Sequence, residues 1–311
     1  MCADKADAVA DLTHDKYRYR YSWLHLIRPM TLTGTINPVI VGTILAAQYG
    51  TVRYDVFTVM LIAAVLVQSA TNIFNDFFDF LYGQDQDKWI LEHQATSRHG
   101  PFHHKTPYIA LSMLGMAAIL GLWLAMHSSV WIILVGAIGI IAGYKYSAGK
   151  TNSLSAIGLG EGVAAIFLGF VPGTVAFVVQ GQLLNGTILA IFSPFALLIS
   201  SMILTNNIRD IDKDHGFRHT IAIRLGRQKA VQLLTALLIL AYVAIIILLV
   251  INALPRMSLV TLLASPAAVR LLWSLRRKAT RAEEKSSMKW AAWHHWLFSL
   301  LLICGLLIGC R

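Results

Sequence analysis

The chain has 311 residues, of which 56% are hydrophobic and 14% charged, with a mean hydropathy of +0.61 and a formal net charge of +10. Soluble domains carry charges on about a quarter of their residues, so this composition excludes an ordinary soluble protein and predicts a polytopic membrane protein. The three cysteines, Cys2, Cys304 and Cys310, exclude a disulfide framework. Residues 1–21 lack the apolar core of a signal peptide, so we expect no cleavable leader.

Apolar runs of about 17–25 residues are long enough to cross a bilayer as helices. In chain order they predict nine transmembrane helices, at about residues 31–50, 55–80, 107–127, 130–147, 154–180, 187–208, 229–251, 256–273 and 290–310. His127, Ser128 and Ser129 mark the boundary between the third run and the fourth. We therefore expect an all-α polytopic fold whose nine helices surround a central cavity. Residues 1–22 would form a cytoplasmic arm and residues 23–311 one transmembrane domain.

Lysine and arginine are strongly segregated among the predicted loops. With the N-terminus inside the cell, all but three of the 26 fall on the cytoplasmic side, the exceptions being Arg53, Arg256 and Arg311. The positive-inside rule therefore supports nine spans in the cell membrane, with the N-terminus inside and the C-terminus outside. The same segregation accounts for the net charge of +10 without a nucleic-acid partner.

Two acidic clusters interrupt the apolar pattern. The first, residues 72–79, ends the second predicted helix, and the second, residues 206–214, ends the sixth. A carboxylate at the centre of a membrane helix costs about 2.5–3.5 kcal/mol, so such residues usually face a cavity and serve a function. Both clusters fall at the cytoplasmic ends of their helices, which indicates one shared site that faces the cytoplasm.

Helical spacing gathers the side chains of each cluster. Spacings of three, four and seven residues place four members of the first cluster on one helical face: Asn72, Asn75, Asp76 and Asp79. Asp210 and Asp214 share a face in the same way. Hard oxygen ligands suit Mg²⁺, which typically takes one or two carboxylates together with substrate phosphates. For Asp85, Asp87 and Asp212 the pattern leaves open whether they assist a metal or are ordinary solvated acids.

Basic residues lie beside both clusters. Lys145 and Lys150 follow the fourth predicted helix, while Arg209, Arg218 and Arg224 surround the second cluster. Arginine offers paired donors to phosphate, and lysine offers a point charge. Acids and bases together suit a magnesium–diphosphate headgroup on a hydrophobic tail. Metal and basic residues would stabilise a departing pyrophosphate, and the helices would exclude water from the allylic carbocation.

Two further groups of polar residues have more than one interpretation. Glu161 lies in the fifth predicted helix, where it either packs against a neighbouring helix or contributes to acceptor binding or proton handling. The histidines of residues 93–104 have the spacing of no standard metal site, and we expect no metal there. The surrounding loop, residues 81–106, is expected to act as a lid over the site.

The clusters resemble the two signature motifs of the UbiA superfamily of intramembrane prenyltransferases. Residues 75–79, Asn-Asp-Phe-Phe-Asp, match the first motif, and Gly83 followed by Asp85 is similar to the branch that prenylates 1,4-dihydroxy-2-naphthoate in menaquinone synthesis. Residues 206–214, Asn-Asn-Ile-Arg-Asp-Ile-Asp-Lys-Asp, resemble the second motif. The stretches 23–38, 158–172 and 218–226 resemble the same branch.

The resemblance implies nine helices and a Mg²⁺-dependent transfer of a polyprenyl group from polyprenyl diphosphate to 1,4-dihydroxy-2-naphthoate. Carbon dioxide would be lost, and demethylmenaquinone formed. By resemblance four acids would bind the metal and act in catalysis: Asp76, Asp79, Asp210 and Asp214. Substrate contacts are expected from Asn72, Asn75, Lys145, Tyr146, Lys150, Asn207, Arg209, Arg218 and Glu161.

Two alternatives remain at this point. Intramembrane acids also mark ion pathways, so a secondary transporter or channel is the alternative from another class. Against transport, the acids cluster at one membrane face beside basic residues. Within the enzyme class, the acceptor could be 4-hydroxybenzoate, homogentisate or haem, because residues near a diphosphate say little about the ring that attacks.

Overall fold

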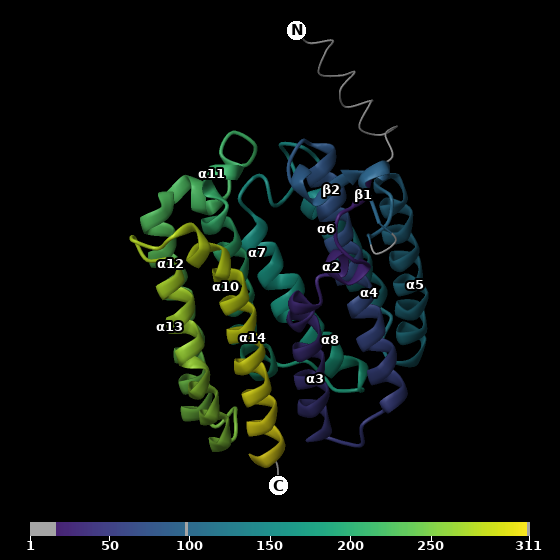
Figure 1. Cartoon of the computed structure of the whole chain (residues 1–311). Helices are drawn as coiled ribbons and strands as arrows, with labels where there is room; N and C mark the ends of the chain where they lie inside the picture. Colours follow the sequence, from purple (N-terminus) through teal and green to yellow (C-terminus); the bar gives the residue numbers. More distant parts are fainter. Residues whose placement is uncertain (1–16, 97–98, 310–311) are drawn as a thin grey trace.

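The computed structural model describes residues 17–96 and 99–309, which form a bundle of long helices along one common axis (Figure 1). The shorter helices and turns are α2 (Trp23–Ile27), η1 (Pro29–Thr31), α7 (Gly160–Ala164), η5 (Ala165–Phe170), α9 (Gly186–Ile191), α11 (Ile211–Asp214) and η6 (Arg256–Ala264). The longer helices are α3 (Thr33–Ala47), α4 (Tyr54–Leu81), α5 (Thr106–His127), α6 (Trp131–Ser147), α8 (Val171–Val179), α10 (Ser193–Arg209), α12 (Ile221–Val250), α13 (Ser265–Ser274) and α14 (Arg281–Gly309).

Seven helical segments within the described residues are long and apolar enough to cross a membrane: Tyr54–Leu81, His103–His127, Gly160–Val179, Gly186–Arg209, Ile221–Val250, Arg256–Ser274 and Arg281–Gly309. The segment Trp23–Thr31 and helix α3 pass the same test together, but they are bent by 49°. Helix α6 is apolar and has 17 residues. The chain is therefore a mostly helical, multi-pass membrane protein, as the apolar runs predict.

Two predicted helix boundaries differ from the structure because apolar runs locate the membrane rather than the helix. Helix α12 starts at Ile221, and Thr220 caps it by accepting a hydrogen bond from the Ile223 amide. Its backbone is non-helical at Gly226 (φ 73°), so the helix predicted from about residue 229 begins just after this break. Helix α14 begins at Arg281, and its polar first turns carry an ion pair between Arg281 and Glu284. Residues 154–159 form turns that precede α7.

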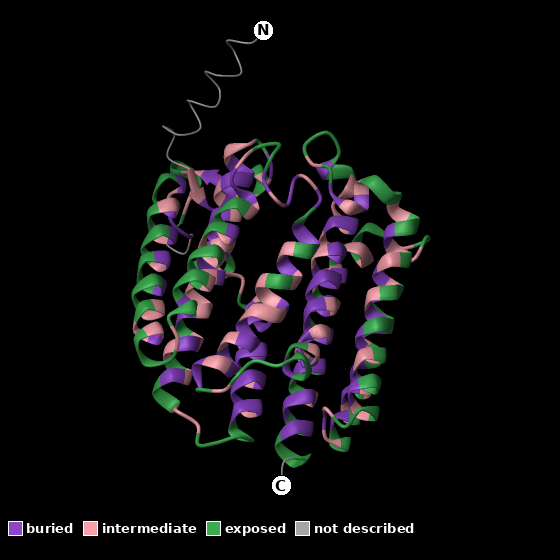
Figure 2. Ribbon diagram, turned by 180° about the vertical axis from the view of Figure 1, so that it is seen from behind, coloured by how far each residue is buried: buried purple, intermediate pink, exposed green. Residues whose placement is uncertain are grey.

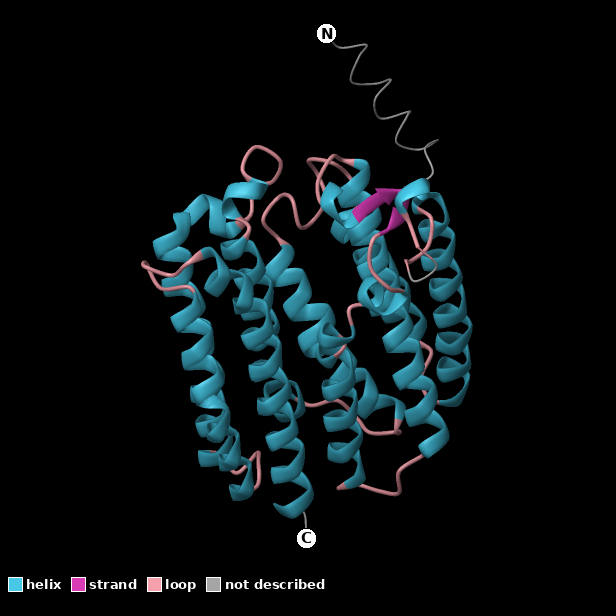
Figure 3. Ribbon diagram, viewed as in Figure 1, coloured by secondary structure: helices cyan, strands magenta, loops and turns pink. Residues whose placement is uncertain are grey.

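A small sheet joins the N-terminal segment to the loop after α4. Strand β1 (Tyr17–Tyr19) pairs antiparallel with β2 (Trp89–Leu91), with Tyr17 opposite Leu91 (Figure 3). The expectation of an all-α fold misses this sheet, since strands of three residues are too short to show alternation. Helix α11, β1 and β2 lie at one end of the bundle, and α14 ends at the other (Figure 1).

Buried residues are frequent in the segments of α10 and α14 and fewer in those of α5 and α12, and Figure 2 colours the ribbon by this burial. Many of the exposed residues are large and apolar. The largest core cluster includes Phe192, Phe195 and Phe298. Helices α3 and α8 pack very closely, since a Cβ atom on Gly42 would lie 2.2 Å from the carbonyl oxygen of Gly173. Small residues permit such close approach between membrane helices.

Candidate active site

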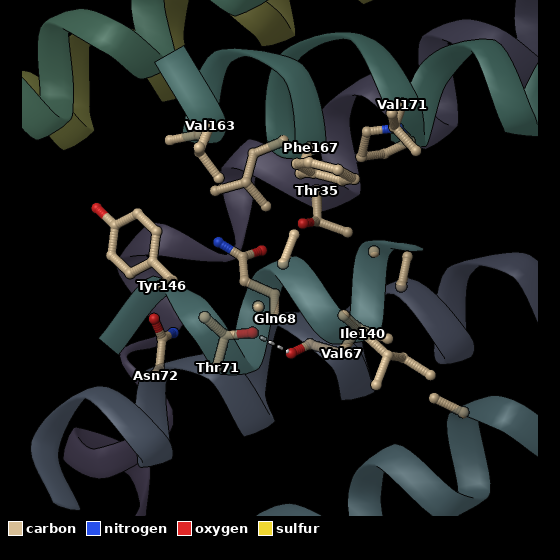
Figure 4. A pocket seen from close by; sticks show the side chains of 18 of the residues that line it. Thr35, Val67, Gln68, Thr71, Asn72, Ile140, Tyr146, Val163, Phe167 and Val171 are labelled. Atoms are coloured by element: carbon tan, nitrogen blue, oxygen red, sulfur yellow. Dashed lines mark hydrogen bonds between the residues drawn. The ribbon is translucent and has the colours of Figure 1, made fainter. Parts of the chain in front are cut away.

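A cavity of about 480 Å³ lies among α4, α5, α6, the η5–α8 segment and α10. Many of its polar lining residues belong to the end of the bundle that carries β1 and β2: Arg28, Asn72, Asn75, Tyr146, Asn206, Asn207 and Arg218. From Asn75 to Met60 the cavity follows α4 for about 22 Å at the helical rise of about 1.5 Å per residue. Figure 4 shows Tyr146 and Asn72 on one side, and the apolar Ile140 and Val171 on the other.

Asp76 is fully buried and is held by donors from three segments. Its carboxylate accepts hydrogen bonds from Arg28 Nη2 at 2.5 Å, from Lys88 Nζ at 2.8 Å and from the Tyr19 hydroxyl at 3.3 Å. Burial raises the pKa of the Tyr19 hydroxyl, which therefore stays a donor. Asp76 does not line the cavity. The four residues of the first cluster are predicted to face one site, but they do not all face the cavity, because the Asp76 carboxylate points toward the N-terminal segment.

Asp79 forms an ion pair with Arg218, which joins the end of α4 to the loop after α11. Burial disfavours the charge of Arg218, but the nearby acids Asp79 and Asp214 together outweigh it and raise the pKa of the guanidinium. Arg218 lines the main cavity, and together with Asp79 and Lys150 it also lines a small neighbouring pocket. The structure therefore brings the end of the first acidic cluster to Arg218, four residues beyond the second cluster, at the polar end of the cavity.

Asn72 and Asn75 fix the segment before α3 against α4. Asn72 Nδ2 donates to the Ile27 carbonyl at 2.8 Å. Asn75 Oδ1 accepts from Arg28 Nη2 at 3.0 Å, and its Nδ2 donates to Ser147 Oγ on α6 at 3.1 Å. Arg28 has a left-handed backbone with φ of 57°, which is unfavourable for a residue with a side chain. The polar contacts of its guanidinium offset this strain.

The second cluster keeps its own arginine. Arg209 pairs with Asp210 at 2.5 Å and donates to Asn206 Oδ1 at 2.7 Å. Asp214 on α11 is buried, and within the described residues its carboxylate forms neither a hydrogen bond nor an ion pair. Burial raises the pKa of the Asp214 carboxyl, and Arg218 partly opposes the effect. A carboxylate in this setting is stabilised when a cation binds beside it.

The remaining predicted substrate residues differ in their positions. Tyr146 lines the cavity, whereas the side chain of Lys145 is exposed and lines neither pocket. Lys150 is exposed and borders the small pocket beside Asp79. Glu161 is buried on α7 and accepts a hydrogen bond from Asn207 Nδ2 on α10 at 2.9 Å.

The loops above the cavity are also linked by charge. Asp85 pairs with Lys88 at 2.5 Å and with Lys213 on α11, so one acid connects the loop after α4 to the second cluster. Asp87 and Asp212 are exposed. His103 is buried against Phe77, Phe80 and Trp89, in a packing role.

The four predicted metal ligands do not gather into one cluster. Across residues 17–96 and 99–309, no group of three or more His, Cys, Asp or Glu side chains is close enough to hold a metal ion. Asp76, Asp79 and Asp210 each pair with an arginine instead. Amide oxygens line the polar end of the main cavity, and the Asp79 carboxylate lines the small pocket beside it. Both are ligands of hard cations such as Mg²⁺.

Three residues of this site are absent from the sequence-based prediction. Arg28, Lys88 and Tyr19 all donate hydrogen bonds to Asp76, from 48, 12 and 57 residues away in the chain. The signals for Arg28 are its position before Pro29 and the family resemblance of residues 23–38. Lys88 and Tyr19 depend on the pairing of β1 with β2, which the sequence does not reveal.

Comparison with known proteins identifies the family. Residues 35–307 match the model of the UbiA prenyltransferase family. A 1,4-dihydroxy-2-naphthoate octaprenyltransferase of Bacillus subtilis is 34% identical over 285 residues, which are 91% of this chain and 91% of that protein.

Solved structures show the same fold at low sequence identity. The apo UbiA homolog of Aeropyrum pernix K1 superposes with a TM-score of 0.64 at 14% identity, covering 90% of this chain and 98% of that one. A UbiA homolog of Archaeoglobus fulgidus bound to GPP and Mg²⁺ gives a TM-score of 0.56 at 13% identity, with 90% and 98% covered. The helical bundle, its cavity and these matches agree, and the chain belongs to the UbiA prenyltransferase family.

Proposed function

We propose that this protein transfers a polyprenyl group from polyprenyl diphosphate to 1,4-dihydroxy-2-naphthoate, with loss of carbon dioxide and pyrophosphate, to give the quinol (reduced) form of demethylmenaquinone. The observation that carries the proposal is the cavity, which follows α4 for about 22 Å from a polar end containing Arg218 and Asn75 to an apolar end at Met60. This shape matches a charged headgroup on a long hydrocarbon tail. The Bacillus subtilis relative is named for the same acceptor.

The diphosphate would lie at the polar end of the cavity. Arg218 carries a planar guanidinium that can exchange part of its contact with Asp79 for phosphate oxygens. Lys150 adds a point charge at the neighbouring pocket. As the bond between the allylic carbon and the diphosphate breaks, these cations stabilise the charge that develops on the leaving group.

The apolar channel would protect the allylic cation. Its walls carry Phe167, Val163 and Ile140, which exclude water that would convert the cation to an alcohol (Figure 4). The face of the Phe167 ring also offers a favourable quadrupole to a neighbouring positive charge. The acceptor ring would then attack, and the electron pair left by departing carbon dioxide would restore its aromaticity.

Mg²⁺ is proposed as the metal. The carboxylate oxygens of Asp79, Asp210 and Asp214 are ligands of the kind that Mg²⁺ prefers. The buried Asp214 carboxylate makes no hydrogen bond or ion pair with another described residue, so its oxygens can accept a cation. The Archaeoglobus fulgidus homolog is described as bound to Mg²⁺. When bound, the metal supplies Lewis-acid stabilisation of the leaving diphosphate. Asp76 would hold Arg28 and Lys88 in place around this site.

We also propose a topology of nine spans in the cell membrane. The count follows if the bent segment Trp23–Ala47 and the shorter helix α6 cross along with the seven longer segments. The arm of residues 1–22 and the polar end of the cavity would face the cytoplasm, in accordance with the positive-inside rule. Residues 23–311 would then form a single prenyltransferase domain.

An assay with a panel of acceptors tests the proposal. Purified protein would receive one polyprenyl diphosphate, Mg²⁺ and, separately, 1,4-dihydroxy-2-naphthoate, 4-hydroxybenzoate or homogentisate. We expect a prenylated product only with the naphthoate, loss of turnover with EDTA and recovery with added Mg²⁺. A product with another acceptor would replace the proposed substrate. No product with any acceptor, together with ion flux in liposomes, would identify a transporter instead.

A further inference from the structure

Glu161 carries a buried oxygen atom that its neighbours do not satisfy. The residue is 6% exposed, and its Oε1 accepts the hydrogen bond from Asn207 Nδ2 at 2.9 Å. Its Oε2 is buried and has no hydrogen-bond partner among the described residues. Buried polar atoms nearly always have partners, and acids inside membrane helices are rare outside functional sites. The position of Glu161 therefore calls for an explanation beyond packing.

Helix packing alone does not account for this carboxylate. Ser200 Oγ already links α10 to the Glu161 backbone carbonyl at 3.2 Å. Further along the same contact, a Cβ atom on Gly169 would lie 2.3 Å from Ala196 Cα, so the helices meet closely without help from the acid. An alanine at position 161 would leave both contacts in place.

The carboxylate instead determines how the Asn207 amide is oriented. Glu161 Oε1 accepts its hydrogen bond from the Nδ2 of Asn207, and this contact directs the nitrogen of the amide toward Glu161. Oδ1 then points the other way. Asn207 lines the cavity beside Tyr146 and Arg218, at the end where the headgroup would lie. Glu161 thus fixes a hydrogen-bond acceptor on the cavity wall.

We propose that Glu161 is a positioning residue that acts through Asn207, whose Oδ1 accepts a hydrogen bond from a hydroxyl group of the aromatic acceptor. This inference rests on the proposed function. The oriented amide oxygen of Asn207 favours the aromatic acceptor over the polyprenyl diphosphate as its hydrogen-bond partner. Diphosphate oxygens are acceptors and gain nothing from it, whereas an aromatic hydroxyl is a donor. A site built to bond a hydroxyl rejects analogues that lack it, because a polar group is then left unpaired.

The test compares acceptors with and without each hydroxyl. Turnover of 1,4-dihydroxy-2-naphthoate would be inhibited competitively by 1-hydroxy-2-naphthoate and by 4-hydroxy-2-naphthoate, in wild-type protein, Glu161→Ala, Asn207→Leu and Ser200→Ala. In wild type we expect one analogue to bind about tenfold more weakly than the dihydroxy compound. In Glu161→Ala and Asn207→Leu, the difference in binding between that analogue and the dihydroxy compound should fall to about twofold or less. In both variants the KM for the naphthoate should rise, while the KM for the diphosphate should stay unchanged.

Ser200→Ala is the matched control, because it removes a hydrogen bond between the same two helices and should keep the wild-type preference. The double variant of Glu161 and Asn207 should lose no more discrimination than either single variant. If Glu161→Ala does not fold, Glu161→Gln keeps the shape but pairs with Asn207 in either amide orientation, and should lose part of the preference. Full preference in a folded Glu161 variant, or an equal rise in both KM values, would overturn the inference. Absence of wild-type turnover would reject the proposed function instead.

Discussion

Asp76 shows how far residue spacing can predict a site. Its spacing from Asn72 and Asp79 correctly places all three at one end of α4, but its carboxylate faces Arg28 and Lys88 and not the cavity. Spacing along one helix defines a face to within a turn. The neighbours that contact this face come from other parts of the chain. In the case of Asp76, the segments that carry Arg28 and Lys88 determine its surroundings.

Replacement of the cluster acids should stop the reaction. We expect Asp76→Ala and Asp210→Ala each to abolish turnover, because each removes the partner that orders an arginine at the site. Asp76→Ala should also lower the free energy of unfolding, by about 2 kcal/mol, since Arg28 loses its carboxylate partner and Lys88 loses one of its two. Asp87→Ala is the control, as Asp87 is exposed. Turnover would be followed by product formation, and activity near the wild-type level in either acid variant would remove that acid from the site.

Arg218 tests the diphosphate position directly. Arg218→Lys keeps the charge but loses the planar pair of donors, so the KM for the diphosphate should rise about tenfold with little change in the KM for the acceptor. Arg227→Lys makes the same exchange in an ion pair with Glu284, outside the cavity lining, and should leave both values unchanged. A rise confined to the KM for the acceptor would contradict the assignment of Arg218 to the diphosphate.

At the scale of helices and strands, the sequence predicts most of what the structure contains. The apolar runs locate α4, α5 and the combined α9–α10 segment within a few residues, because burial in lipid imposes a minimum length on each span. The same method misses β1, β2 and the polar first turns of α14, since these lie where no such constraint acts. The segments it misses include the ones that supply Tyr19 and Lys88 to Asp76.

Close packing between α3 and α8 gives a prediction about stability. Gly42→Ala would place a methyl group 2.2 Å from a backbone carbonyl that cannot move independently of its helix. We expect a loss of about 1–3 kcal/mol, measured as a lower midpoint of thermal unfolding in detergent. Gly115→Ala on α5 has nothing within 4 Å of the added atom and should be neutral. Equal effects at the two glycines would argue against the close α3–α8 contact.

At the scale of the whole molecule, the segregation of lysine and arginine predicts which loops face the cytoplasm, and this membrane orientation can be tested. In a background with Cys2, Cys304 and Cys310 replaced by serine, single cysteines would be introduced at Thr51 and at Gln94, both exposed and expected on opposite sides. A membrane-impermeant thiol reagent added to intact cells should label position 51 and leave position 94 protected until the cells are opened. The reverse pattern would invert the proposed topology.

The central claim is decarboxylative transfer of a polyprenyl group to the naphthoate. The most direct measurement uses 1,4-dihydroxy-2-naphthoate labelled in its carboxylate, polyprenyl diphosphate, Mg²⁺ and the purified protein, and quantifies labelled carbon dioxide, pyrophosphate and prenylated product together. The account predicts that all three appear in equal amounts. Prenylated product that retains the labelled carboxylate, or pyrophosphate released without product, would contradict it.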